Sequence, residues 1–226
     1  LWQHGPGMMW IALAGALSAA HLLASGAAYG VAVLVRPLNA FIAAANGLYV
    51  SYRERSLLPA IKVGVGALAG LALLVAYNAA VYGEPSLLGG YDSKVIESAG
   101  SSDLVGYARN VGLALISPTR GVLIWSPFLL VLVPGIRAAW RVAPPWARGG
   151  ALGGLIYLLV QLKANRFSGG SGFPAYRYPL EALTAAAPLL LLAYTKWVAL
   201  RPRALWLFSR LVILAFAFHT VFAVRF

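Results

Sequence analysis

The chain has 226 residues, of which 61% are hydrophobic and only 11% charged, and its mean hydropathy is +0.77. A soluble domain of this size could not bury so much apolar side chain, so the composition excludes a soluble globular protein and predicts an integral membrane protein. The net charge of +12 does not indicate a partner such as nucleic acid, because the basic residues are dispersed between apolar segments. The absence of cysteine excludes disulfides and thiolate metal sites.

The apolar segments predict an all-α, polytopic bundle that forms a single transmembrane domain over residues 1–226. Several segments approach or reach the roughly 20 residues needed to cross a membrane, and the alternation typical of strands is absent. We expect about six to eight membrane helices, including short broken or re-entrant ones. The clearest cover residues 57–81, 121–137, 146–163, 179–198 and 204–224. The chain begins without an initiator Met, so we expect it to be the C-terminal part of a longer polypeptide.

Basic residues at the ends of apolar segments predict how the helices are oriented. By the positive-inside rule, Lys and Arg at helix ends face the cytoplasm. The three clusters are Arg53, Arg55 and Lys62; Arg137, Arg141 and Arg148; and Lys196, Arg201 and Arg203. The predicted helices then alternate consistently, and loops 82–120 and 164–178 are expected outside.

The apolar segment at residues 27–50 is interrupted by Arg36 and Pro37. Proline disfavours a straight helix through this point. Two short helices would form a hairpin whose tip is external, together with residues 2–5. A single kinked span would instead place residues 2–5 in the cytoplasm.

Several basic residues fall on the predicted outer side, where the positive-inside rule expects few. They are Arg36, Lys94, Arg109, Arg120, Lys163, Arg166 and Arg177. Ionisable groups near membrane depth are costly unless they are paired or line an aqueous cavity. An anionic ligand at the outer face would account for them.

Arg120 follows a segment, residues 105–116, that is too short to span a membrane and is expected at its surface. Ser117 and Pro118 end this segment, and Gly121 opens the next predicted span. Arg120 would therefore lie at a helix start, where free backbone N–H groups attract an anion such as phosphate. A turn with a snorkelling arginine explains the same pattern.

The segment Arg166–Pro179 is rich in glycine and aromatic residues and carries a second cation, Arg177. Its glycines permit close approach to a ligand, its aromatic rings suit sugar faces, and Arg177 can bind phosphate through two hydrogen bonds. Aromatic residues also gather at membrane interfaces without any catalytic role.

The acidic residues give no clear catalytic pattern. Those expected at or near the outer side are Glu84, Asp92, Glu97, Asp103 and Glu181. Each could act as a base or metal ligand, but no spacing resembles a metal site, and solvated loop carboxylates are the simpler interpretation. His4 is a candidate substrate contact, whereas His21 and His219 lie in apolar segments and are expected to be packed.

A series of short motifs resembles the bacterial GT-C glycosyltransferases over nearly the whole chain. The motifs occupy residues 1–6, 26–37, 77–78, 82–85, 90–91, 117–121, 125–127, 169–170 and 177–178. The chain departs from the series at Pro174-Ala175-Tyr176, where the family pattern leads us to expect Gly-Pro-Arg.

The resemblance implies an enzyme of the bacterial inner membrane that transfers a sugar from a polyprenyl-phosphate donor to an extracytoplasmic glycan, lipid or protein. It implies that the principal catalytic carboxylate lies in a preceding N-terminal loop, so no catalytic residue is assigned here. The residues that it assigns to the lipid phosphate are Arg36, Arg120 and Arg177, and those assigned to the sugar or acceptor are His4, Tyr176 and Tyr178. No cofactor is predicted, a divalent metal is left open, and membrane lipid and other membrane proteins are expected partners.

Two other classes of protein remain open from the sequence. A transporter or flippase for a lipid-linked or anionic solute also contains broken helices and intramembrane arginines, but would be expected to carry an internal repeat. A non-catalytic subunit of a membrane complex would pair its external arginines with partner carboxylates or lipid head groups.

Overall fold

The computed structural model describes residues 4–87, 89, 103–165 and 176–225, and within these residues all regular structure is helical. The predicted all-α class is therefore confirmed. In chain order the elements are α1 (His4–Leu17), α2 (Leu22–Val35), η1 (Pro37–Asn39), α3 (Ala40–Glu54), α4 (Leu58–Tyr82), α6 (Leu104–Ile116), α7 (Val122–Trp125), α8 (Phe128–Val142), α9 (Pro145–Ala164), α10 (Pro179–Ala193), η2 (Tyr194–Val198) and α11 (Pro202–Arg225).

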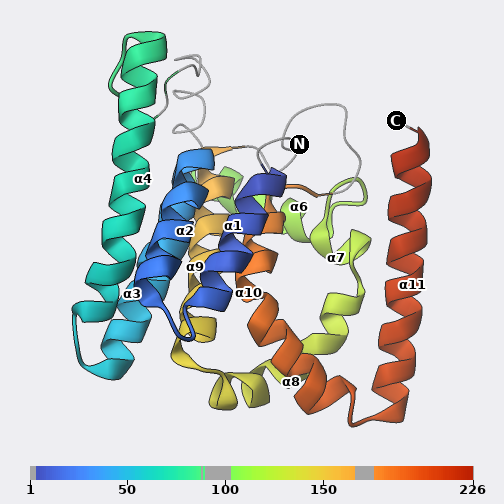
Figure 1. Ribbon diagram of the computed structural model, residues 1–226. Coiled ribbons are helices and arrows are strands. Elements are labelled where there is room, and N and C mark those ends of the chain that lie inside the picture. The colour runs from blue at the N-terminus through green and yellow to red at the C-terminus, as the bar shows by residue number, and fades with distance from the viewer. Residues whose placement is uncertain (1–3, 88, 90–102, 166–175, 226) are drawn as a thin grey trace.

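The helices run up and down between two ends of the molecule (Figure 1). One end carries the start of α1, the junction between α2 and α3, the end of α9 and the start of α10; we call it the His4 end. The opposite end carries the turns between α1 and α2, α3 and α4, α8 and α9, and η2 and α11; we call it the Arg53 end. All three basic clusters predicted to face the cytoplasm lie in or next to turns of the Arg53 end.

The hairpin alternative for residues 27–50 is confirmed. Arg36 adopts an extended backbone, with φ −148° and ψ 113°, as expected for a residue before proline. The chain then forms the short 3-10 turn η1 and reverses into α3. This reversal places Arg36 at the tip of the hairpin, in contact with His4. The junction between α2 and α3 lies at the His4 end (Figure 1).

Glycines let the helices at the centre of the bundle approach closely. A Cβ added at Gly153 of α9 would lie 2.7 Å from the Cα of Ile42 in α3, and one at Gly154 would lie 2.7 Å from the carbonyl oxygen of Ala182 in α10. On the other side of the core, a Cβ at Gly66 of α4 would collide with the backbone of Gly26 in α2. Small residues at such crossings bring backbones together as in membrane helix pairs. The result is a fixed scaffold in which α9 packs against both α3 and α10.

Two predicted helices differ in the structure. The prediction of a continuous helix over residues 121–137 is wrong. The helix α7 ends at Trp125, and α8 begins only at Phe128, after Ser126 and Pro127. A proline cannot donate the backbone hydrogen bond that would join the two segments. The helix expected at 179–198 changes at Tyr194 into the π-helical segment η2.

Two of the described helices are long and apolar enough to cross a membrane, α4 over its whole length and α11 over Pro202–Phe222. The expected number of six to eight membrane helices is not confirmed. The helices α1 and α2 have 14 residues each. At about 1.5 Å per residue they are shorter than a hydrocarbon core of about 30 Å.

Candidate functional site

Three side chains from distant parts of the sequence meet at the His4 end of the bundle. His4 lies in the first turn of α1, Arg36 at the tip between α2 and η1, and Glu181 in the first turn of α10. We call His4, Arg36 and Glu181 the charged cluster. The hairpin at Pro37 and the packing of α10 on α9 bring these residues together.

The charged cluster is held by short polar contacts. Nδ1 of His4 lies 2.8 Å from Oε1 and 3.0 Å from Oε2 of Glu181. Nη1 of Arg36 donates to Oε1 of Glu181 at 2.8 Å and lies 2.6 Å from Nδ1 of His4. When the imidazole proton is on Nδ1, His4 donates to Glu181, so the carboxylate accepts from both partners and Nδ1 accepts no hydrogen bond from Arg36.

All three side chains of the charged cluster are buried or largely buried. Glu181 is 0% exposed and His4 is 5% exposed, and the side chain of Arg36 is 13% exposed. A buried carboxylate without a cation would be very costly, and Arg36 supplies the counter-charge for Glu181. With neutral His4, the charges of Arg36 and Glu181 cancel.

Two side chains of α9 lie next to the charged cluster. Gln161 accepts from Nη2 of Arg36 through its side-chain oxygen, at a long distance of 3.4 Å. Tyr157, fully buried one turn earlier, brings its hydroxyl near Glu181 and Arg36. Thus Arg36 is held from two directions, by a carboxylate and by an amide.

Two further residues of the predicted site adjoin the charged cluster. The ring of Tyr178 lies 6.3 Å from that of His4, and the guanidinium of Arg177 lies 5.3 Å from the Tyr178 ring. Nε of Arg177 is buried and makes no hydrogen bond within the described residues. Asn39, on η1, also has a buried Oδ1 without a hydrogen bond there. The region therefore combines a neutralised ion pair with an additional cation.

Tyr176 lies in a different environment from the charged cluster. Its hydroxyl is 2.7 Å from Oγ of Ser126, and its ring centroid lies 6.2 Å from that of His219 in α11. Burial raises the pKa of the Tyr176 hydroxyl. Trp125 also packs against His219, so Tyr176 belongs to an aromatic contact between α7 and α11. His219 is packed there, as predicted, and its Nδ1 lies 2.8 Å from the carbonyl oxygen of Ala215. The same prediction is wrong for His21, which is exposed in the turn between α1 and α2.

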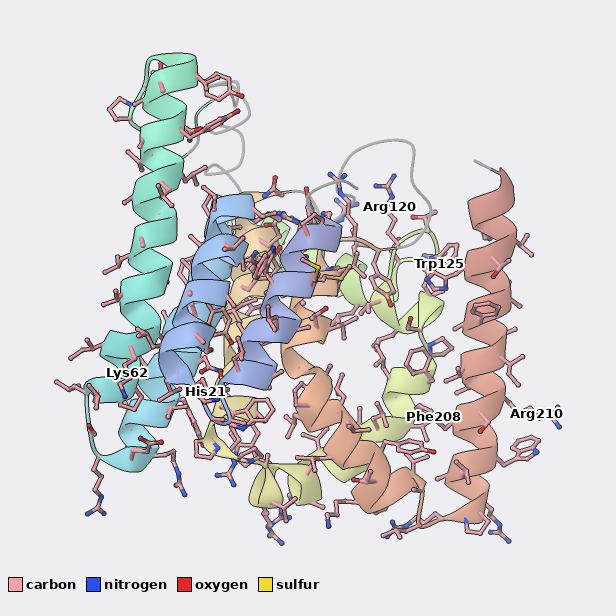
Figure 2. All side chains as sticks on the ribbon, viewed as in Figure 1. His21, Lys62, Arg120, Trp125, Phe208 and Arg210 are labelled. Carbon is pink, nitrogen blue, oxygen red and sulfur yellow. The ribbon has the colours of Figure 1, made fainter. Side chains whose placement is uncertain are left out.

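Arg120 is in the turn between α6 and α7 and is partly buried (Figure 2). The backbone N–H of Gly121 donates to the carbonyl of Ser117 at 2.7 Å, and a Cβ at Gly121 would collide with this turn. The expectation that Arg120 begins a long helix is wrong, because α7 has only four residues. The argument for an anion at that helix start therefore no longer applies.

The interpretation of Glu181 as a solvated loop carboxylate is also wrong, since it is fully buried. A signal for this was present in the sequence: Glu181 is the only charged residue among positions 179–195, which are mostly apolar. An acid in such a segment requires a partner. Asp103 accepts from the backbone N–H of Gly106 at 2.6 Å and caps α6.

Part of the predicted site lies outside the described residues. This applies to Asp92, Glu97 and the stretch 166–175 of the glycine-rich loop. Within the described part of the chain, no group of three His, Asp or Glu side chains could hold a metal ion.

The predicted site residues are thus brought together in part. His4, Arg36, Arg177 and Tyr178 form one neighbourhood around Glu181, and Tyr176 lies in another. Comparison with known proteins adds no family: no family model matches the chain, and neither a curated protein nor a solved structure matches it significantly.

Proposed function

We propose that this chain is the membrane domain of a GT-C-type glycosyltransferase, with several membrane passes in the bacterial inner membrane. The enzyme transfers a sugar from a polyprenyl-phosphate donor to an extracytoplasmic acceptor. The proposal is carried by one observation: a neutralised, buried ion pair borders a second arginine, Arg177, whose Nε has no partner within the described residues. Such an arrangement suits an anionic group that arrives with the substrate.

The proposed reaction places the charge of the leaving group beside Arg177. The acceptor oxygen forms a bond to the anomeric carbon, the bond from this carbon to the phosphate oxygen breaks, and the electron pair remains on the phosphate. Arginine donors aimed at that oxygen stabilise the developing charge in the transition state. The acceptor proton leaves to a base that lies outside the charged cluster, because Glu181 is already engaged by Arg36 and His4.

The three basic clusters of the chain support the proposed orientation. The basic clusters around Arg53, Arg141 and Arg201 are at the Arg53 end, which faces the cytoplasm by the positive-inside rule. The His4 end is then extracytoplasmic, where a polyprenyl-phosphate sugar would be used. The long apolar helices α4 and α11 accord with insertion in a membrane.

The test is binding of polyprenyl phosphate to the purified protein in detergent, measured by native mass spectrometry. Arg177→Gln should weaken binding by about ten-fold or more, because a charge-assisted hydrogen bond to phosphate is lost. Arg137→Gln is the matched control, since it removes an exposed cation at the Arg53 end and should leave binding unchanged. Equal binding by the wild type and Arg177→Gln would contradict the proposal.

A further inference from the structure

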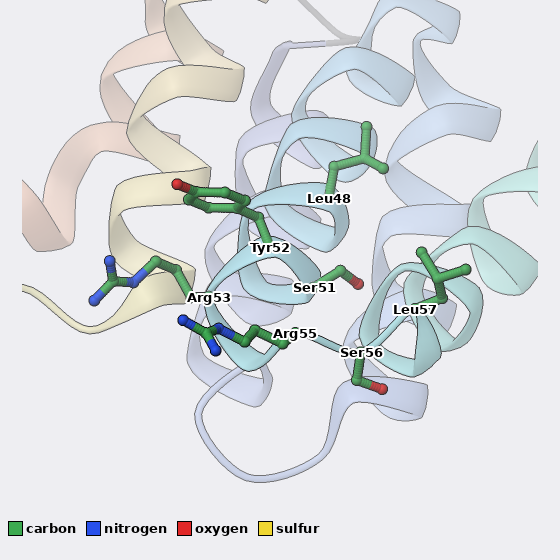
Figure 3. A pocket seen from close by; sticks show the side chains of 7 residues that line it. All are labelled: Leu48, Ser51, Tyr52, Arg53, Arg55, Ser56 and Leu57. Atoms are coloured by element: carbon green, nitrogen blue, oxygen red, sulfur yellow. The ribbon is translucent and has the colours of Figure 1, made fainter.

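A hollow of about 730 Å³ lies at the Arg53 end, against the turn that joins α3 to α4 (Figure 3). It is open to the surroundings, and its lining combines Leu48, Tyr52 and Leu57 with Arg53 and Arg55. None of these residues belongs to the charged cluster. The hollow is therefore a separate feature of the molecule.

The apolar side chains of the hollow are exposed, as are many others on this chain. Leu48 is 60%, Leu57 73% and Tyr52 75% exposed. Figure 3 shows the two leucines on one side of the turn and the two arginine side chains extending on the other, below the Tyr52 ring. Apolar and cationic groups are thus separated across a few residues, as an amphipathic ligand requires.

The two cations of the hollow are exposed. Neither Arg53 nor Arg55 forms an ion pair with any residue that the structure describes. Glu54 lies between them in sequence and reduces the local charge, whereas Lys62, one helix turn into α4, adds to it (Figure 2). The net charge of these four residues is positive.

The turn that carries the arginines has a defined conformation. Arg55 takes the left-handed conformation, with φ 53°, which residues other than glycine seldom adopt. Oγ of Ser51 accepts from the backbone N–H of Ala60 at 2.8 Å, and Oγ of Ser56 accepts from that of Leu58 at 3.2 Å. The hydroxyls are therefore used to hold the turn, and the arginines remain available to bind a ligand.

We propose that this hollow binds an anionic phospholipid of the cytoplasmic leaflet. Arginine is suited to the planar recognition of phosphate, tyrosine to the boundary between head group and acyl chain, and leucine to the chain itself. A soluble phosphate would not contact the exposed leucines, and a zwitterionic lipid would not offset the net positive charge of the turn. The inference depends on the membrane orientation in the proposed function, but not on sugar transfer.

The experiment is native mass spectrometry of the full chain in detergent with phosphatidylglycerol or phosphatidylcholine added in equal amounts. The wild type should retain phosphatidylglycerol preferentially. Each basic residue near an anionic lipid surface contributes roughly a five-fold gain in binding, so the double variant Arg53→Gln/Arg55→Gln should lose roughly 25-fold in affinity for phosphatidylglycerol. The control Arg137→Gln/Arg141→Gln removes the same charge from exposed sites at the same end and should retain the preference.

Three results would overturn this inference. The preference for phosphatidylglycerol could persist in Arg53→Gln/Arg55→Gln, it could fall equally in the control pair, or inorganic phosphate could displace the lipid and so identify a soluble ligand. The outcome is independent of the test of the proposed function. Loss of polyprenyl phosphate binding is expected in Arg177→Gln, whereas loss of phosphatidylglycerol is expected only in the Arg53 and Arg55 variant.

Discussion

The two ends of the bundle differ in whether their arginine side chains are buried and paired or exposed. At the His4 end, Arg36 is largely buried and contacts Glu181, His4 and Gln161. At the Arg53 end, cations such as Arg53 and Arg137 are exposed and form no ion pair with described residues. The same residue type is therefore a fixed structural element at one end and a surface charge at the other.

This difference separates two reasons for having an arginine in an apolar chain. Exposed cations at helix ends need no specific partner, because they are stabilised by water and lipid head groups and contribute to orientation. A buried cation requires a matching carboxylate and fixes the helices that carry both. The charged cluster ties α1, the α2–α3 hairpin and α10 together, and a ligand site can form on such a fixed frame.

The contrast between the two ends of the bundle assumes that they lie on opposite sides of a membrane. Chemical labelling of single introduced cysteines can test this assumption with an all-or-none result. The chain has no cysteine, so Ser56→Cys and Glu84→Cys each introduce one thiol, both at exposed positions flanking α4. In intact cells, a membrane-impermeant maleimide should label Glu84→Cys and not Ser56→Cys. After lysis both should react. Labelling of both thiols in intact cells would show that α4 does not span the membrane in the proposed orientation.

Removing the carboxylate of the charged cluster should give the largest loss of stability. Glu181→Ala leaves Arg36 buried without its counter-ion, which should lower the free energy of unfolding by about 3–5 kcal/mol. The measurement is unfolding in mixed detergent micelles, followed by circular dichroism. Glu54→Ala, at an exposed acid of the Arg53 end, should change the same free energy by less than about 0.5 kcal/mol. Similar values for the two variants would show that the ends do not differ as described.

The fold was predictable where one local rule dominates. The extended conformation of Arg36 before Pro37 and the long apolar helix at α4 follow from backbone sterics and hydropathy. The break between α7 and α8 was missed, although Ser126 and Pro127 mark it, because the apolar pattern continues across it. The hydropathy of a segment indicates how apolar its environment is, but it does not indicate where the backbone hydrogen bonds of a helix are interrupted.

Most residues of the site could be named from the sequence, but their contacts with one another could not all be predicted. His4, Arg36, Arg177 and Tyr178 were named from their motifs and do lie together. Glu181 was grouped with loop acids because its partner is 145 positions away in the sequence. Such a pairing depends on the hairpin and on the glycine contacts of α9, which no local pattern expresses.

The smallest effect should come from replacing arginine with lysine, which keeps the charge and changes only its geometry. At Arg36 the guanidinium reaches Glu181 through Nη1 and Gln161 through Nη2. A lysine ammonium is a single point of charge on a flexible stem and cannot make both contacts in the same way. Arg36→Lys should therefore lower the free energy of unfolding by about 1–2 kcal/mol. Arg53→Lys, where the side chain is exposed, should change it by less than about 0.5 kcal/mol. If Arg36→Lys proved as neutral as Arg53→Lys in the same micelle titration, charge alone would hold the cluster together. The forked geometry of Arg36 would then have to be explained by ligand binding instead of by folding.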